Sequence, residues 1–366
     1  MKISLLKTVD KLVGIPAVRL LPAPKKRPSK PPTSALLIRP GGIGDAALLV
    51  PAIIALKSAF PDLAIDILAE KRNCAVFSLT GGITRVFRYD KPKEFLSAIR
   101  GSYSIVIDTE QWHRLSAVVA RLIDASMTLG FSTNERKKSF THAVPYSHDD
   151  YEVHSFLKLI APITGEVMFD PNKPFLTIPE SHQETTKLQL CHLGDKKIAA
   201  IFPGGSIREK RWGSDKFRET AKAFIHEGLG VVVLGGRNDI GSGNIITDGL
   251  PGILNLCGKL SLLETAAVLK KSDLLVTADS GLMHIAYGLG TRIVALFGPS
   301  NLKKWAPKGD RSITINSKVQ CSPCSKFGYT PKCKINVLCM SAISIAEVFE
   351  ASMSLLGNSK LTTIAF

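Results

Sequence analysis

The chain has 366 residues, of which 45% are hydrophobic and 21% are charged, a length that usually divides into two domains. Lysine and arginine outnumber aspartate and glutamate by 47 to 31, so the net charge of +16 favours nucleic acid, anionic lipid or a phosphorylated substrate as partner. No uncharged apolar run approaches the roughly 20 residues of a membrane-spanning helix. Lys7, Asp10 and Lys11 also interrupt the N-terminal apolar stretch, which fits a secretory signal poorly, so a cytoplasmic protein is expected.

Residues 1–33 are predicted to be a basic N-terminal segment that precedes the folded domains. Their apolar residues repeat at helical spacing until Gly14 and Pro16 end the helix: Ile3, Leu6, Val9, Leu12 and Val13. Such a helix either lies on a membrane surface or packs on the protein's own body. The sequence LPAPKKRPSKPPTS that follows is typical of an extended tether.

Short apolar runs alternate with helical stretches from Ser34 onward, which predicts βαβ units and parallel sheets. Residues 34–180 form the first predicted domain, with strands in ALLIRP, AIDILAE and SIVIDT and a short one in VFRYD. Residues 181–340 form the second, with strands in KIAAIFPGG, VVVLGG, ILNLCG, LLVTAD and RIVALFG. Residues 341–366 are a C-terminal helix and tail that either end the second domain or cross back to the first.

We therefore expect an α/β protein of two facing, Rossmann-like, doubly wound domains with a cleft between them. Ligands of such sheets bind outside the carboxyl ends of the strands. Three glycine-rich motifs follow predicted strands, and they are the candidate site.

The first motif is RPGGIGDAAL, residues 39–48. Gly41, Gly42 and Gly44 let the backbone turn out of the strand, and Asp45 then lies in the first turn of a helix. A carboxylate there is either a helix cap or a base that removes a proton from an acceptor hydroxyl.

The same turn also matches a dinucleotide fingerprint, Gly42-x-Gly44-x-x-Ala47, with Glu70 after the next strand. This match keeps an NAD-dependent oxidoreductase open as an alternative. Asp45 argues against it, because its charge takes the place of a pyrophosphate at the helix N-terminus.

The second motif is FPGGSIREKRWGSDKF, residues 202–217. Gly204 and Gly205 leave a strand, and Ser206 and Lys210 follow among other cations. Exposed backbone amides beside cations suit a diphosphate. The alternative is a basic loop in solvent.

The third motif is VTADSGLMHIAYGLGTRIVALFGPS, residues 276–300. Asp279 ends a strand, and Ser280 and Gly281 precede a helix that contains His284. The helix start has no further acidic residue, so it is a good anion site, and Asp279 suits the hydroxyls of a sugar. His284 by itself is more typical of a buried structural histidine.

Four of the seven cysteines fall in one short stretch: Cys321, Cys324, Cys333 and Cys339. Their number suits a structural zinc or iron–sulfur site, although the spacing is only moderately specific. Any such metal is expected to lie outside catalysis.

The motifs RPGGIGDAAL, PGGSIREKRWG, VVVLGGRND, DSGLMHIAYGLGT and ALFGPS, in this order and with the late cysteines, resemble the ADP-heptose:lipopolysaccharide heptosyltransferase family, glycosyltransferase family 9. The resemblance covers nearly the whole chain after Ser34. It implies a GT-B fold whose N-terminal domain holds the acceptor and whose C-terminal domain holds an ADP-sugar. It also implies inverting transfer of a heptose to the inner core of lipopolysaccharide, without a catalytic metal or other cofactor.

The resemblance further implies roles for residues at matching positions. Asp45 matches the general base, and Ser206 and Lys210 match contacts to the donor phosphates. Asp239 matches an acidic residue near the nucleotide ribose, although glutamate is frequent in the family at this position. Asp279 matches a carboxylate that contacts the sugar.

Ser280, Gly281 and His284 belong to the same donor motif by resemblance, with Ser280 standing where threonine is common. An anionic lipid A and core oligosaccharide acceptor fits the positive charge of the chain and peripheral contact with the cytoplasmic face of the inner membrane. Basic residues of the first domain could meet this acceptor: Lys71, Arg72, Arg85, Arg88, Arg114, Arg136, Lys137 and Lys138. A membrane-binding or nucleic-acid-binding protein remains an alternative that leaves the paired motifs without a purpose, so no nucleic acid is expected.

Overall fold

A computed structural model describes residues 8–24, 31–326 and 329–357 of the chain. Much of the predicted N-terminal helix and tether falls in residues 1–7 and 25–30, which lie outside the described residues, as does the tail at 358–366. Among the helices that are described, none combines the length and apolar character needed to cross a bilayer.

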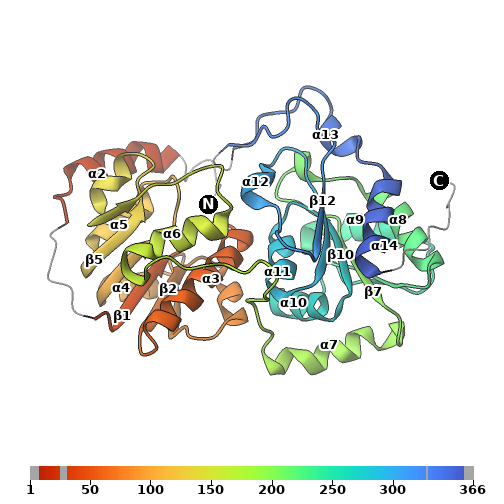
Figure 1. The fold of residues 1–366 in the computed structure, drawn as a ribbon, viewed down its shortest axis with the longest axis horizontal. Helices are drawn as coiled ribbons and strands as arrows, with labels where there is room; N and C mark the ends of the chain where they lie inside the picture. Colours follow the sequence, from red (N-terminus) through yellow and green to blue (C-terminus); the bar gives the residue numbers. More distant parts are fainter. Residues whose placement is uncertain (1–7, 25–30, 327–328, 358–366) are drawn as a thin grey trace. The chain divides into compact units, whose positions relative to one another are not determined.

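The chain divides into two units, Met1–Phe169 and Asp170–Phe366 (Figure 1). The first contains a parallel sheet in the order β3-β2-β1-β4-β5-β6. Its strands are β1 Ser34–Ile38, β2 Ala64–Ala69, β3 Arg85–Arg88, β4 Ser102–Asp108, β5 Asp124–Phe131 and β6 His142–Val144. Its helices are α2 Ile15–Leu20, α3 Ile43–Ala59, α4 Pro92–Ile99, α5 Leu115–Leu122 and α6 Glu152–Thr164.

The second unit contains a parallel sheet in the order β12-β11-β10-β7-β8-β9. Its strands are β7 Ile198–Phe202, β8 Gly230–Val233, β9 Ile253–Asn255, β10 Leu274–Ala278, β11 Arg292–Leu296 and β12 Ser312–Ile315. Its helices are α7 Gln183–Leu190, α8 Ser214–His226, α9 Ile240–Thr247, α10 Leu262–Lys271, α11 Gly281–Leu289, α12 Leu302–Trp305, α13 Leu338–Ser341 and α14 Ile345–Leu356.

Both sheets have the doubly wound strand order. The first three strands of each unit extend the parallel sheet toward one edge, and the fourth strand pairs with the first and extends it toward the other edge. In the first unit, Leu36 and Ile38 pack with residues of α4 and α5 in one core cluster. Leu37, between them, is equally buried and faces the other side of the sheet, because successive strand residues alternate. Burial on both faces explains why these strands read as continuous apolar runs.

Helix α14 belongs to the core of the second unit. Val348, Phe349 and Met353 join a buried cluster with α8 and the central strands. The indole of Trp212 donates a hydrogen bond of 3.0 Å to the Ile343 carbonyl, which fixes the chain just before this helix.

The segment that follows Phe169 also packs on the second unit. The backbone amides of Phe175 and Leu176 both donate to the Gly288 carbonyl at the end of α11, at 2.8 and 2.9 Å. The boundary between the two units therefore falls after Phe169, at the start of this segment.

Candidate functional site

The motifs lie at the point in each sheet where the strand order reverses. In the first unit this point lies between β1 and β4, and in the second between β7 and β10. At their carboxyl ends, β1 is followed by the motif of Asp45 and β4 by the loop that contains Gln111. In the same way, β7 is followed by the motif of Lys210 and β10 by the motif of Asp279. Crevices at such points are where doubly wound sheets bind ligands.

Asp45 lies in the first turn of α3, as predicted. Gly41 turns the chain out of β1 with a φ of 106°, a conformation that favours glycine. A Cβ atom added to Gly42 would lie 2.9 Å from Asp45 Oδ2, so the carboxylate sits over the glycine turn. This is where a dinucleotide pyrophosphate would have to bind, and the arrangement disfavours the NAD alternative.

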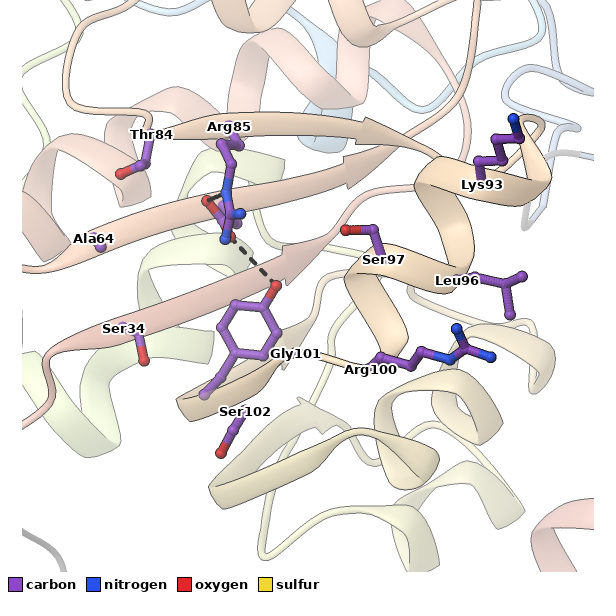
Figure 2. A pocket seen from close by; sticks show the side chains of 12 residues that line it. Ser34, Ala64, Thr84, Arg85, Lys93, Leu96, Ser97, Arg100, Gly101 and Ser102 are labelled. Atoms are coloured by element: carbon purple, nitrogen blue, oxygen red, sulfur yellow. Dashed lines mark hydrogen bonds and ion pairs between the residues drawn. The ribbon is translucent and has the colours of Figure 1, made fainter.

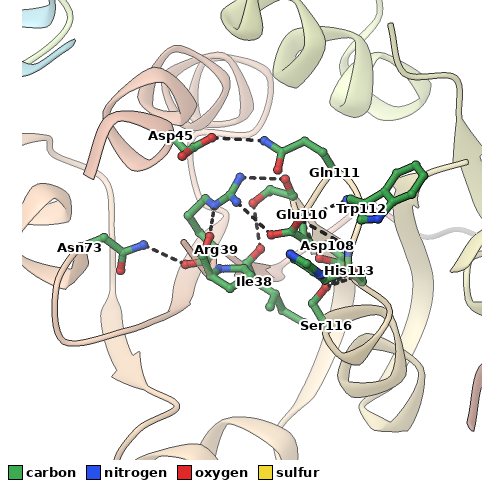
Figure 3. A network of polar contacts seen from close by, with 12 residues as sticks. Ile38, Arg39, Asp45, Asn73, Asp108, Glu110, Gln111, Trp112, His113 and Ser116 are labelled. Atoms are coloured by element: carbon green, nitrogen blue, oxygen red, sulfur yellow. Dashed lines mark hydrogen bonds and ion pairs between the residues drawn. The ribbon is translucent and has the colours of Figure 1, made fainter. Parts of the chain in front are cut away.

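Gln111 contacts Asp45 (Figure 3) and connects it to a second carboxylate, that of Glu152. Its Nε2 donates to Asp45 Oδ1 at 3.3 Å and to Glu152 Oε1 at 2.5 Å. The hydroxyl of Tyr146 donates to Glu152 Oε2 at 3.1 Å. Burial raises the pKa of Tyr146, and the charges of Glu152 and Asp45 raise it further, so this phenol stays protonated. Within the described part of the chain, Asp45 is thus held by a neutral amide rather than by a cation.

A buried ionic network lies beneath this site (Figure 3). Arg39 is fully buried and donates to the Thr109 carbonyl at 2.8 Å and to Glu110 Oε2 at 3.4 Å. Burial raises the pKa of Glu110, but the charges of Arg39, His113 and Arg136 outweigh it and lower that pKa overall. The network fixes the loop that carries Gln111.

Arg136 is equally buried and bonds to the carboxylate of Asp108 at the end of β4 and to the Glu110 carbonyl. This guanidinium is therefore part of the protein interior, contrary to the prediction that it could meet an acceptor. Several other basic residues in that prediction also have acidic partners: Arg72 with Glu70, Arg85 with Asp66, Arg88 with Asp90, and Arg114 with Glu135.

In the second unit, the structure brings Lys210, Asp279 and His284 together. Lys210 Nζ lies 2.6 Å from Asp279 Oδ2, and His284 Nε2 lies 3.9 Å from Asp279 Oδ1. Ser300 donates to Asp279 Oδ2 at 2.5 Å. Burial raises the pKa of Asp279, but the charge of Lys210, followed by that of His284, lowers it overall. Asp279 is therefore an ionised, buried carboxylate that orients a lysine.

Ser280 and Gly281 form the start of α11. The Ser280 hydroxyl caps the helix by accepting a 3.2 Å hydrogen bond from the Met283 amide. His284 is buried in the next turn, with its ring edge-to-face against Trp305 at 6.1 Å between centroids. Helix α11 has nine residues, and its N-terminus, the positive end of the helix dipole, thus lies beside the Lys210–Asp279 pair.

Asp239 lies against the glycine turn that follows β7. Its Oδ2 accepts from the Gly236 amide at 2.9 Å, and a Cβ added to Gly204 would lie only 2.5 Å from its Oδ1. The glycine is required for this close approach. Gly205 and the exposed Ser206 continue the turn toward Lys210.

The four late cysteines lie near one another. Burial raises the pKa of Cys339 to about 11, and the charges of Cys321, Cys324 and Cys333 add to this rise. Within the described part of the chain, no three histidine, cysteine or acidic side chains are arranged to bind a metal ion. The structural metal stays a prediction.

A basic hollow of about 650 Å³ lies at the opposite, amino edge of the first sheet (Figure 2). Arg85, Lys93 and Arg100 line it, together with Tyr103, whose hydroxyl donates to Asp66 at 3.3 Å. Ligands of doubly wound sheets bind at the carboxyl edge, so this hollow is not a substrate site by position.

Sequence reasoning missed Gln111, Glu152, Tyr146 and Ser300. Gln111 and Glu152 belong to no motif and become neighbours of Asp45 only through the fold. Ser300 ends the ALFGPS motif, so its position after β11 was the available signal.

Comparison with known proteins identifies the family. Residues 94–334 match the model of glycosyltransferase family 9 (heptosyltransferase). Lipopolysaccharide heptosyltransferase 3 of Escherichia coli K12 is 29% identical over 287 residues, which cover 72% of this chain and 82% of that protein.

Two solved structures share the fold. That of E. coli ADP-heptose lps heptosyltransferase II has a TM-score of 0.73 at 22% identity, covering 89% of this chain and 99% of the other. The iron-containing dodecameric glycosyltransferase TibC of enterotoxigenic E. coli has a TM-score of 0.59 at 15% identity, covering 90% and 78%. These likenesses and the two parallel sheets confirm the predicted fold class. The chain belongs to glycosyltransferase family 9, the heptosyltransferase family, and is a glycosyltransferase.

Proposed function

We propose that this enzyme transfers a heptose from ADP-heptose to the inner core of lipopolysaccharide, with inversion at the anomeric carbon. The names of its relatives support this donor and acceptor. The observation that carries the mechanism is the contrast between Asp45, held by the amide of Gln111, and the Lys210–Asp279 pair at the equivalent edge of the other sheet.

The proposed reaction is a single displacement. An acceptor hydroxyl oxygen attacks the anomeric carbon and forms the new glycosidic bond, while the bond from that carbon to the diphosphate oxygen breaks. Asp45 takes the hydroxyl proton, and ADP leaves with the bonding electron pair. Gln111 positions Asp45 by donating to Oδ1, which leaves Oδ2 for the proton.

The second unit supplies the donor site in this proposal. Lys210 and the amides at the start of α11 stabilise the negative charge on the leaving diphosphate, so no divalent cation or other cofactor is required. Asp279 keeps Lys210 in place and, with His284, lies next to the sugar. Asp239 and Ser206 complete the contacts to the nucleotide.

The cysteine cluster has no role in this reaction. The enzyme is proposed to act at the cytoplasmic face of the inner membrane, where its anionic, lipid-linked acceptor is made. Peripheral attachment through positive charge suits this location.

The test is turnover of ADP-heptose on a lipopolysaccharide inner-core acceptor, measured as ADP release in the presence of EDTA. We expect Asp45→Asn to lower kcat by about 10²- to 10⁴-fold, because the amide cannot accept the proton. ADP should raise the melting temperature of wild type and variant equally, since the donor site lies in the other unit. Asp62→Asn, which removes an exposed carboxylate after α3, is the matched control.

Full activity of Asp45→Asn would exclude this residue as the base. Loss of activity in EDTA that a divalent cation restores would contradict the role given to Lys210. Thermal stabilisation by NADH but not by ADP would contradict the donor.

A further inference from the structure

The segment Asp10–Leu20 is a helix that presents one apolar side to solvent. It begins as a π-helical turn at Asp10–Gly14 and continues as α2. Asp10, Gly14 and Val18, four residues apart, are buried where the segment packs on α5 and on the turn at Glu135–Ser139. Leu12 and Leu20 are 70% and 83% exposed on its other side.

Polar contacts hold the helix in this orientation. Asp10 Oδ1 accepts hydrogen bonds from the amides of Arg114 and Leu115 at 2.6 and 2.9 Å, which caps the start of α5. Burial raises the pKa of Asp10, but the hydrogen bonds from His113 and these amides lower it overall. Beyond the helix, Arg121 Nε donates to the Pro22 carbonyl at 2.8 Å. We call these contacts the anchor. They hold the helix so that its apolar side faces solvent.

Further apolar residues are exposed near Leu12 and Leu20. Val13 and Pro16 are exposed on the same helix, and Leu122, at the end of α5, is 61% exposed beside the attached chain at Pro22. We call Leu12, Val13, Pro16, Leu20 and Leu122 the apolar surface. Clustered apolar residues of this kind mark an interaction site rather than ordinary surface.

The part of the sequence that carries most of the apolar surface is basic. Residues 1–33 contain eight lysines and arginines and a single acidic residue, Asp10, which is buried in the anchor. Lys11 and Arg19 are exposed on the helix itself, and Arg19 also lies 3.7 Å from Glu135. Leucines flanked by cations match the interface of an anionic bilayer, where apolar side chains enter the acyl boundary and cations meet phosphates.

We infer that the apolar surface docks the first unit on an anionic lipid bilayer. This inference rests on the proposed function only for the nature of the acceptor, and it assigns membrane contact to named side chains. The anchor is attached to the loop that carries Gln111, because Asp10 binds the amides of Arg114 and Leu115 directly after it. The bilayer thus lies near the loop that positions Asp45, where a lipid-linked acceptor must arrive.

The experiment is co-sedimentation of the full-length protein with phosphatidylcholine vesicles that contain about 30% phosphatidylglycerol. We expect the double variant Leu12→Ser, Leu20→Ser to bind at least about tenfold more weakly than wild type, because two apolar side chains no longer leave water. The control is Leu96→Ser, Met168→Ser, which removes two exposed apolar side chains elsewhere in the unit and should bind like wild type. Vesicles of phosphatidylcholine alone should bind wild type more weakly.

Unchanged vesicle binding by Leu12→Ser, Leu20→Ser, or no binding of wild type to the anionic vesicles, would overturn the inference. So would sedimentation velocity without lipid that shows a wild-type dimer lost in this variant, because a second copy would then cover the surface. The melting-temperature shift with ADP, recorded on the same samples, keeps the two proposals apart. Its absence would contradict the donor site in the second unit and leave the vesicle result standing.

Discussion

Replacing Lys210 with methionine tests the electrostatics of the second unit directly. The lysine Nζ lies 2.6 Å from Asp279 Oδ2, and the two side chains are 20% and 9% exposed. Methionine keeps much of the apolar stem and removes the charge. Breaking a buried ion pair on one side destabilises a protein by about 3–5 kcal/mol. Lys210 is partly exposed and Ser300 still donates to the carboxylate, so we expect about 1–3 kcal/mol at neutral pH.

The penalty should depend on pH in a defined direction. In the wild type the folded-state pKa of Asp279 is lowered, so the pair contributes stability above the unfolded value of about 3.9 and loses it as pH falls further. Without Lys210, burial is the largest influence left and raises that pKa relative to wild type. The variant then loses stability as pH rises through its raised pKa, so its penalty relative to wild type is largest at about pH 7. The penalty shrinks as pH falls and becomes small only well below about pH 3.9, where the wild-type pair is also lost.

The assay is urea unfolding followed by tryptophan fluorescence in a Trp112→Phe background. The remaining tryptophans, Trp212 and Trp305, both belong to the second unit, so the signal reports that unit. Lys222→Met is the matched control, since Lys222 forms an exposed pair with Glu219 at 2.7 Å on α8 and should contribute less than about 0.5 kcal/mol. Equal penalties for the two variants, or a Lys210→Met penalty that does not shrink on acidification, would refute the reasoning.

Three further substitutions test other parts of the structure. Arg136→Met should destabilise the first unit by about 3–5 kcal/mol, because it leaves the Asp108 carboxylate buried without its cation; the fluorescence of Trp112 in urea measures this. Gly204→Ala should weaken ADP binding in calorimetry by roughly tenfold or more, because the new methyl would displace Asp239. Cys321→Ser should leave turnover of ADP-heptose unchanged, because the cysteine cluster has no part in the proposed reaction; ADP release measures this.

The sequence predicted the alternation of strands and helices because parallel strands buried on both faces must be apolar throughout. Every strand expected from an apolar run is present, including the short β3. Strands β5, β6 and β12 were not predicted. The sequence of β5, DASMTLGF, mixes polar residues and glycine with apolar ones, and β12 is a short, half-buried strand at the sheet edge.

The sequence indicated a candidate site residue only where a polar or charged side chain directly follows a predicted strand or glycine turn. Asp45, Lys210 and Asp279 each follow a glycine turn or strand end, so the topology places them at the carboxyl edges of the sheets. Gln111 and Glu152 carry no such signal, because their meeting depends on how α6 packs beside α3. The N-terminal helix shows the same limit. Its periodicity left membrane contact and self-packing as alternatives, and the described part packs on the body while presenting an apolar side to solvent.

The contacts of the carboxylates explain why Asp45 suits the role of base. Glu110 is bonded to the buried Arg39, and Asp279 is bonded to Lys210, and both carboxylates have lowered pKa values. Taking up a proton at either group would remove a charge from a buried ion pair, at a cost of several kcal/mol. Asp45 receives its hydrogen bond from the neutral amide of Gln111, which is retained when the carboxylate is protonated on its other oxygen. A proton can therefore move to and from Asp45 without breaking an ion pair, and this difference, rather than charge alone, supports its assignment as the base.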